Sequence, residues 1–185
     1  TPPVVVELVM PPLEVEVEPP EVEVDPPEVE LEVEPVVVEV TVSAQFAQLK
    51  FTGAGTSADN VVSIQVAGNK GSEILTFTAS TAISAMMAAI NQFTDLTGVS
   101  ATLSGAGGAM YFNSVGYGSS QFVSVEAIEN SFDVTGGVSA TRNTGEDADV
   151  LINGQQATVQ GLVASLRTSN LDIQIQLTSD FGTAL

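Results

Sequence analysis

The sequence predicts an α+β fold, mostly antiparallel β with one amphipathic helix, preceded by an extended segment rich in Pro, Val and Glu. Three observations lead to this prediction. Residues 1–42 contain all nine prolines and 12 of the 23 acidic residues, but no Lys or Arg. From residue 36 onward, short runs of β-branched and aromatic residues alternate with Gly and Asn turn signals. One stripe of apolar residues at helical spacing lies at about residues 81–94.

The first 35 residues repeat a proline pair followed by alternating Glu and Val, as in residues 19–24 and 26–31. Alternation with a period of two is typical of an extended strand, and each proline fixes φ and removes an amide donor. Residues 1–35 are therefore expected to be extended. They form a stiff solvated spacer if the carboxylates keep them apart from other elements, or docked strands if a neighbouring sheet covers the valines.

Residues 36–185 are expected to form one β-rich domain. Its first strands are predicted at residues 36–42 and 47–51, after which the glycines of residues 53–55 break the pattern. Strands at residues 61–66 and 73–78 flank Gly68-Asn69-Lys70-Gly71, whose spacing favours a hairpin.

The helix is predicted from five apolar positions spaced by three or four residues: Ile83, Met86, Met87, Ile90 and Phe93. Ser80 or Thr81 is placed to cap its first turn, and Gly98 to end the segment. A methionine pair can hold a soft ligand, but a stripe at this spacing is more often part of a core. The helix is therefore expected to pack its methionines against the sheet.

The later strands are predicted at residues 99–103, 110–112, 121–125, 149–152, 156–159 and 171–177. Asn153-Gly154 between two of them is the strongest hairpin signal in the chain. Strict alternation in the final segment predicts one buried face.

The composition argues against catalysis. The chain contains no His, Cys or Trp, which removes the usual near-neutral acid/base, thiol nucleophiles and Cys/His metal ligands. The glycine-rich stretches at residues 53–55 and 105–108 do not open a helix and lack a following Lys-Ser/Thr pair, so we interpret both as turns. We predict a protein that is not an enzyme, with no catalytic, cofactor-binding or metal residues.

The acidic residues within Glu146-Asp147-Ala148-Asp149 are the one candidate cation site that the sequence offers. Ca²⁺ needs six to eight oxygen ligands, and no loop of suitable length surrounds these residues. A solvated turn is the favoured interpretation. The formal charge of −19, with only four basic residues, also argues against nucleic-acid binding. No apolar stretch approaches the ~20 residues that span a bilayer, so no membrane partner is expected.

Several short motifs resemble, in their order, the surface-exposed outer domain of bacterial flagellins that carry the flagellin hook IN motif. In residues 60–125 these are Val62-Ser63-Ile64-Gln65-Val66-Ala67-Gly68-Asn69-Lys70-Gly71, Leu75-Thr76-Phe77, Ala88-Ala89-Ile90-Asn91, Thr97-Gly98-Val99-Ser100-Ala101 and Tyr117-Gly118-Ser119-Ser120-Gln121-Phe122-Val123-Ser124-Val125. Thr144-Gly145-Glu146-Asp147-Ala148 and Ile152-Asn153-Gly154-Gln155-Gln156-Ala157 follow, within closing hairpins expected at about residues 141–178.

The resemblance implies a structural role without catalysis. The chain would be a subunit or outer domain of an extracellular bacterial flagellar-type filament, decorating its surface and making subunit contacts. Its partners would be copies of itself in a helical polymer and other flagellar subunits. The alternative interpretation is a β-rich adhesin or cap-like binding module carried on an acidic stalk.

Overall fold

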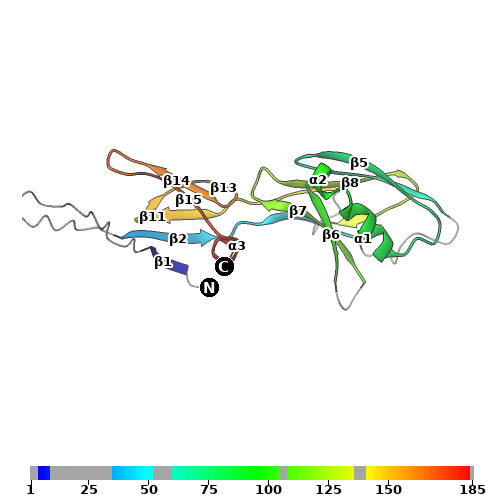
Figure 1. Cartoon of the computed structure of the whole chain (residues 1–185), viewed down its shortest axis with the longest axis horizontal. Helices are drawn as coiled ribbons and strands as arrows, with labels where there is room; N and C mark the ends of the chain where they lie inside the picture. The colour runs from blue at the N-terminus through cyan, green and yellow to red at the C-terminus, as the bar shows by residue number, and fades with distance from the viewer. Residues whose placement is uncertain (1–3, 9–34, 52–59, 105–107, 136–140, 184–185) are drawn as a thin grey trace, which may run out of the picture.

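The computed structural model describes residues 4–8, 35–51, 60–104, 108–135 and 141–183. Figure 1 shows an elongated molecule with two lobes joined by a narrow connection. We call the lobe that contains the first and last described elements the terminal lobe, and the other the distal lobe. Each has its own hydrophobic core. The segment from residue 9 to residue 34, with most of the acidic repeat, lies outside the described residues.

The terminal lobe contains a four-stranded and a three-stranded sheet, with strand orders β1-β2-β11-β12 and β13-β14-β15. Its elements are β1 (Val4–Leu8), β2 (Val36–Val42), β11 (Asp149–Ile152), β12 (Gln155–Gln156), β13 (Thr158–Gln160), β14 (Val163–Arg167), β15 (Asp172–Gln176) and α3 (Ser179–Gly182).

The distal lobe contains two four-stranded sheets, with strand orders β10-β8-β4-β5 and β6-β7-β3-β9. Its elements are β3 (Phe46–Phe51), β4 (Val62–Gly68), β5 (Gly71–Phe77), α1 (Ile83–Asn91), α2 (Thr94–Thr97), β6 (Val99–Leu103), β7 (Met110–Tyr117), β8 (Phe122–Glu129), β9 (Val134–Thr135) and β10 (Arg142–Thr144).

The distal lobe is inserted between two neighbouring strands of the terminal lobe. The chain leaves after β2 and returns before β11, and these two strands pair with each other, with Val42 opposite Asp149. Every pairing between described strands is antiparallel, which confirms the predicted α+β fold dominated by antiparallel sheet. The boundary expected near residue 35 stays a prediction.

Two hairpins follow directly from local sequence. Gly68 lies opposite Gly71, so Asn69-Lys70 forms the two-residue turn between β4 and β5. Ile152 lies opposite Gln155, and the turn residues Asn153 and Gly154 have φ values of 51° and 75°. Positive φ at both central positions is the requirement of a type I′ turn, which Asn-Gly meets at low cost.

The predicted strand at residues 156–159 is wrong in detail, because the chain changes sheets at Ala157. This residue is buried, and its N–H donates to the carbonyl of Val150 at 2.9 Å. Strand β12 therefore ends beside β11, and β13 begins in the other sheet, opposite β14.

The prediction of a single helix also needs correction. The apolar segment divides into α1 and the short α2, and α3 follows at the end of the described chain. Gly98 ends α2 in the left-handed conformation, with a φ of 76°. Neither Ser80 nor Thr81 caps α1. Its N-cap is Ala82, which makes no side-chain cap hydrogen bond, while the Thr81 hydroxyl donates to the carbonyl of Thr78.

The helix packs as expected against the distal core. Met86 and Ile90 are fully buried, and Ile83, Met87 and Phe93 are partly buried against the same cluster. That cluster draws residues from both distal sheets, and includes a stacked pair, Phe51 and Phe132, whose ring centroids are 4.0 Å apart.

Asn91 ties the end of α1 to the edge strand β6. Its side-chain amide donates to the carbonyl of Ala101 at 2.9 Å, and its Oδ1 accepts from the N–H of Ala101 at 2.7 Å. The side chain thus satisfies the exposed edge of β6 in the manner of another strand.

Replacing Asn91 by Asp is expected to lower the free energy of unfolding by about 1 to 2 kcal/mol. The carboxylate still accepts from the N–H of Ala101, but its second oxygen faces the Ala101 carbonyl without a proton to donate. Urea unfolding checks this. Asn91→Gln, which keeps the amide on a longer side chain, is the comparison, and equal stability of Asn91→Asp and the parent would contradict the edge contact.

Candidate functional site at the lobe junction

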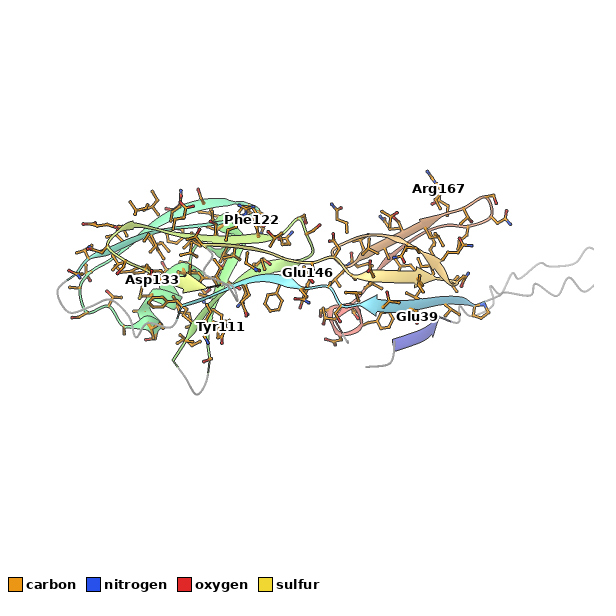
Figure 2. The ribbon with its side chains drawn as sticks, turned by 180° about the vertical axis from the view of Figure 1, so that it is seen from behind. Glu39, Tyr111, Phe122, Asp133, Glu146 and Arg167 are labelled. Atoms are coloured by element: carbon orange, nitrogen blue, oxygen red, sulfur yellow. The ribbon has the colours of Figure 1, made fainter. Side chains whose placement is uncertain are left out.

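Four segments that are distant in sequence meet where the two lobes join. They are residues 43–45, 117–121, 145–148 and 160–162, whose backbones are linked by hydrogen bonds. Figure 2 shows Glu146 at this narrow region. We call these four segments the junction. Two motifs that carry the sequence resemblance, Tyr117-Gly118-Ser119-Ser120 and Thr144-Gly145-Glu146-Asp147-Ala148, therefore come together here.

Backbone hydrogen bonds join the two segments through which the chain passes between the lobes, residues 43–45 and 145–148. Gln45 and Glu146 exchange both N–H to carbonyl bonds, at 2.8 and 2.9 Å. The carbonyl of Gln45 also accepts from the N–H of Gly118 at 3.0 Å. The two connecting segments thus form a short antiparallel β-bridge and are not independent linkers.

Three glycines allow this close approach. A Cβ on Gly145 would lie 2.5 Å from the carbonyl oxygen of Gln45, and one on Gly118 would lie 2.5 Å from the Cα of Gly161. Gly118 and Gly161 also have φ values of 103° and 61°, which favour glycine. The backbones of both lobes are in direct contact here because these residues lack side chains.

Asp147 is the polar centre of the junction. Its carboxylate accepts from the N–H of Ser119 at 3.0 Å, from the Ser119 hydroxyl, and from the N–H of Gly161 at 2.6 Å. Ser119 follows β7 of the distal lobe, and Gly161 joins β13 to β14 of the terminal lobe. One carboxylate therefore bridges the two lobes.

These hydrogen bonds outweigh the effect of burial on the carboxyl group. Partial burial raises the pKa of Asp147, but the hydrogen bonds from the Ser119 hydroxyl, the Gly161 N–H and the Ser119 N–H together hold the pKa below its ordinary value of 3.8. The charged form is thus the one that the folded junction favours.

Asp147→Asn is expected to lower the free energy of unfolding at pH 7 by about 1 kcal/mol, since charge-assisted hydrogen bonds become neutral ones. A lowered folded-state pKa stabilises the fold above the unfolded pKa, and this contribution is lost as pH falls through the folded value. The difference in Tm between the parent and Asp147→Asn should therefore stay constant from pH 7 to about pH 5 and shrink below about pH 4. Asp149→Asn, at an exposed position on β11, is the matched control, and a difference in Tm that is the same at pH 3 would contradict the role of the charge.

The candidate cation site is not assembled. Glu146 and Asp149 are exposed and Asp147 is committed to the junction, so the three carboxylates do not converge. Among the described residues, no group of three or more Asp or Glu side chains is placed to hold a metal ion. Of the two glycine-rich stretches, residues 53–55 and 105–107 lie outside the described part of the chain.

An open groove of about 410 Å³ lies beside the junction. It is lined by Gly116, Tyr117, Ser120, Gln121, Gln160, Gly161, Leu162, Val163 and Gln176. None of these side chains is a carboxylate, an amine or a guanidinium, so the groove offers mainly amide and hydroxyl hydrogen bonding, with the Tyr117 phenol as its one ionisable group.

The four basic residues do not form a cationic surface. Arg142 stacks on Phe122 with its guanidinium carbon 3.6 Å from the ring centroid, and the Lys50 amine lies 5.7 Å from the ring centroid of Tyr111. Lys70 lies in the turn between β4 and β5. Arg167 pairs with Asp172 on the exposed β14–β15 hairpin. Within the described ranges, no helix is long and apolar enough to cross a bilayer.

No family model matches the sequence, and no curated protein matches it. Solved structures do share the fold. The D2-D3 domains of the flagellar cap protein FliD from Serratia marcescens superpose with a TM-score of 0.52 and 18% identity, covering 78% of this chain and 85% of that one.

Two other flagellar cap structures are similar. FliD from Bdellovibrio bacteriovorus gives a TM-score of 0.51 and 14% identity over 69% of this chain and 77% of that one. FliD (HAP2) from Pseudomonas aeruginosa PAO1 gives 0.51 and 13%, over 77% and 79%. At these identities the likeness establishes the fold alone. It extends over most of both chains.

Sequence reasoning missed the junction. The three glycines and Asp147 all belong to quoted motifs or to turns, but nothing local indicates that residues 118, 147 and 161 meet. The only available signal was a carboxylate two residues after a glycine, in a motif that precedes a strand.

Proposed function

We propose that this chain is a structural module without catalytic activity in an extracellular bacterial flagellar assembly, and that it resembles a cap component. The observation that carries the proposal is the two-lobed antiparallel fold shared with three flagellar cap structures over at least 69% of this chain. Two lobes held together by a hydrogen-bonded junction suit a rigid element of an assembly.

Of the two interpretations that the sequence raised, the cap-like module has the better support, because the similar solved structures are named as cap proteins. The outer domain of a filament subunit is the second candidate. It is favoured by the order of the sequence motifs. Two of these motifs meet at the junction, where they hold the two lobes together. Both candidates place the chain outside the cell and among copies of itself.

Immunogold electron microscopy of flagella from the source cells distinguishes the two candidates. Antibodies raised against the described lobes are expected to label the distal filament tip if the chain belongs to a cap. Uniform labelling along the filament would replace the cap proposal by the filament-subunit one. Absence of gold from flagella, with label elsewhere on the cell, would overturn both. A strain without the gene is the control for specificity.

A further inference from the structure

Strand β1 contacts the fold by pairing with β2. The two are antiparallel in an unbroken five-residue register that runs from Val4 opposite Val40 to Leu8 opposite Val36. β1 is the end strand of its sheet, while β2 pairs on its other side with β11. The edge of β2 that faces away from β11 therefore accepts one short strand, and we call it the acceptor edge.

The two strands are nearly identical in sequence. Val4–Leu8 reads Val-Val-Val-Glu-Leu, and residues 36–40 read Val-Val-Val-Glu-Val. The register is symmetric about the pair formed by Val6 and Val38. The acceptor edge thus pairs with a short valine-rich strand through backbone hydrogen bonds, which any copy of the chain can supply equally well.

The connection between the two strands is far longer than their pairing requires. Antiparallel neighbours in hairpins are joined by about 2 to 5 residues, whereas residues 9–35 separate Leu8 from Val36. A connection of this length reaches about 90 Å when extended. As a tether, it gives β1 an effective concentration at its own β2 on the order of millimolar. Neighbouring copies packed in an assembly reach similar concentrations, so the tether alone does not determine whether β1 pairs with β2 of its own chain or of a neighbour.

We propose that β1 is exchanged between copies, so that Val4–Leu8 of one chain pairs with β2 of a second chain. The hydrogen bonds are the same within and between chains, and exchange therefore costs little beyond the loss of the tether. The contact is head-to-tail, since β1 of one copy pairs with β2 of the next, and such contacts either close into rings or extend into open chains. This inference specifies how the proposed self-association occurs, and its biological role rests on the proposed function.

The charge of the exchanging region sets a condition on this contact. Residues 1–42 carry 12 acidic side chains and no base, so two copies brought together through them repel each other. Salt screens such repulsion, with a Debye length of about 10 Å at 0.1 M. Exchange between chains should therefore increase with ionic strength as well as with protein concentration.

Disulfide crosslinking tests the exchange, because the chain has no cysteine of its own. Val5 and Glu39 lie directly opposite each other in the register, and Glu39 is partly exposed. Val5→Cys chains are mixed with Glu39→Cys chains at millimolar concentration, oxidised, and separated on non-reducing gels. We expect a disulfide-linked heterodimer that increases with protein concentration and from 50 to 500 mM NaCl. The double variant should close within one chain at micromolar concentration and form a ladder at millimolar concentration.

A second pair provides the matched control. Ser165 and Gln174 lie opposite each other on β14 and β15, which a short turn joins. The double variant Ser165→Cys with Gln174→Cys should close within one chain at every concentration, and a mixture of the single variants should give no heterodimer.

Two results would overturn the exchange. One is a Val5→Cys and Glu39→Cys heterodimer no more abundant than the homodimers or the control mixture, while the double variant closes within the chain. The other is failure of the double variant to crosslink at all. The experiment uses the purified chain alone, so either result leaves the flagellar proposal standing. Failure of the immunogold labelling would leave the exchange standing in turn.

Discussion

Met86→Asp is expected to unfold the distal lobe. Met86 lies on α1 with none of its side chain exposed, inside the cluster formed by both distal sheets. Truncating a buried methionine costs about 2 to 5 kcal/mol, and an ionisable group without a buried partner adds several kcal/mol more. The sum is comparable to the whole stability of an ordinary domain, about 5 to 15 kcal/mol.

Amide hydrogen exchange followed by mass spectrometry locates the effect. Peptides from β3 to β8 should lose protection in Met86→Asp, whereas the parent keeps it. Ala88→Asp is the control, because it introduces the same residue on the exposed side of the same helix and should lower the free energy of unfolding by no more than about 1 kcal/mol, the loss of helix propensity. Protection that persists in Met86→Asp would show that α1 is not part of the distal core.

The comparison with Met87 shows what the helical stripe predicts and what it leaves open. Spacing alone places Met86 and Met87 together in the core. In the structure Met86 is fully buried, while Met87 is at the rim of the cluster and only partly buried. The position of the covering sheet determines which methionine is more deeply buried, and the helical spacing of the sequence does not reveal that difference. An Asp at Met86 should therefore be more damaging than one at Met87.

Elements determined by neighbouring residues were predicted well. The Asn69-Lys70 and Asn153-Gly154 turns are specified by residues that tolerate the turn conformation, and β2, β4 and β11 follow their apolar runs. The break between α1 and α2 was missed, because the uninterrupted apolar spacing through Phe93 indicated a single helix.

Features determined by distant contacts could not be predicted. Strand β13 separates from β12 because β14 and β15 offer a second sheet, which only the folded chain contains. Asp147 looked like a weak cation ligand in sequence, and only the meeting of Ser119 with Gly161 makes it a bridge between lobes. The flagellin resemblance itself stays a prediction, since the fold is shared with named cap structures.

Gly161→Ala is expected to disrupt the junction and lower the free energy of unfolding by roughly 2 to 5 kcal/mol. Two costs combine at this position. The φ of 61° is left-handed, which costs an alanine about 1 to 2 kcal/mol. The new Cβ would also lie 2.6 Å from the carbonyl oxygen of Tyr117, a backbone atom of the distal lobe that cannot rotate away. Relief of this clash requires the lobes to separate, which also strains the hydrogen bond from the Gly161 N–H to Asp147.

Gly154→Ala separates these two costs. Its φ of 75° is similar, but a Cβ there would have no atom within 4 Å, so only the conformational cost of about 1 to 2 kcal/mol applies. Urea unfolding of both variants measures the difference, and amide exchange at residues 117–121 and 145–148 shows whether the loss lies at the junction. If Gly161→Ala were no less stable than Gly154→Ala, the contact between the two backbones would not hold the lobes together. The junction would then act as a hinge, and the rigid two-lobed shape on which the proposed structural role depends would have to come from other contacts.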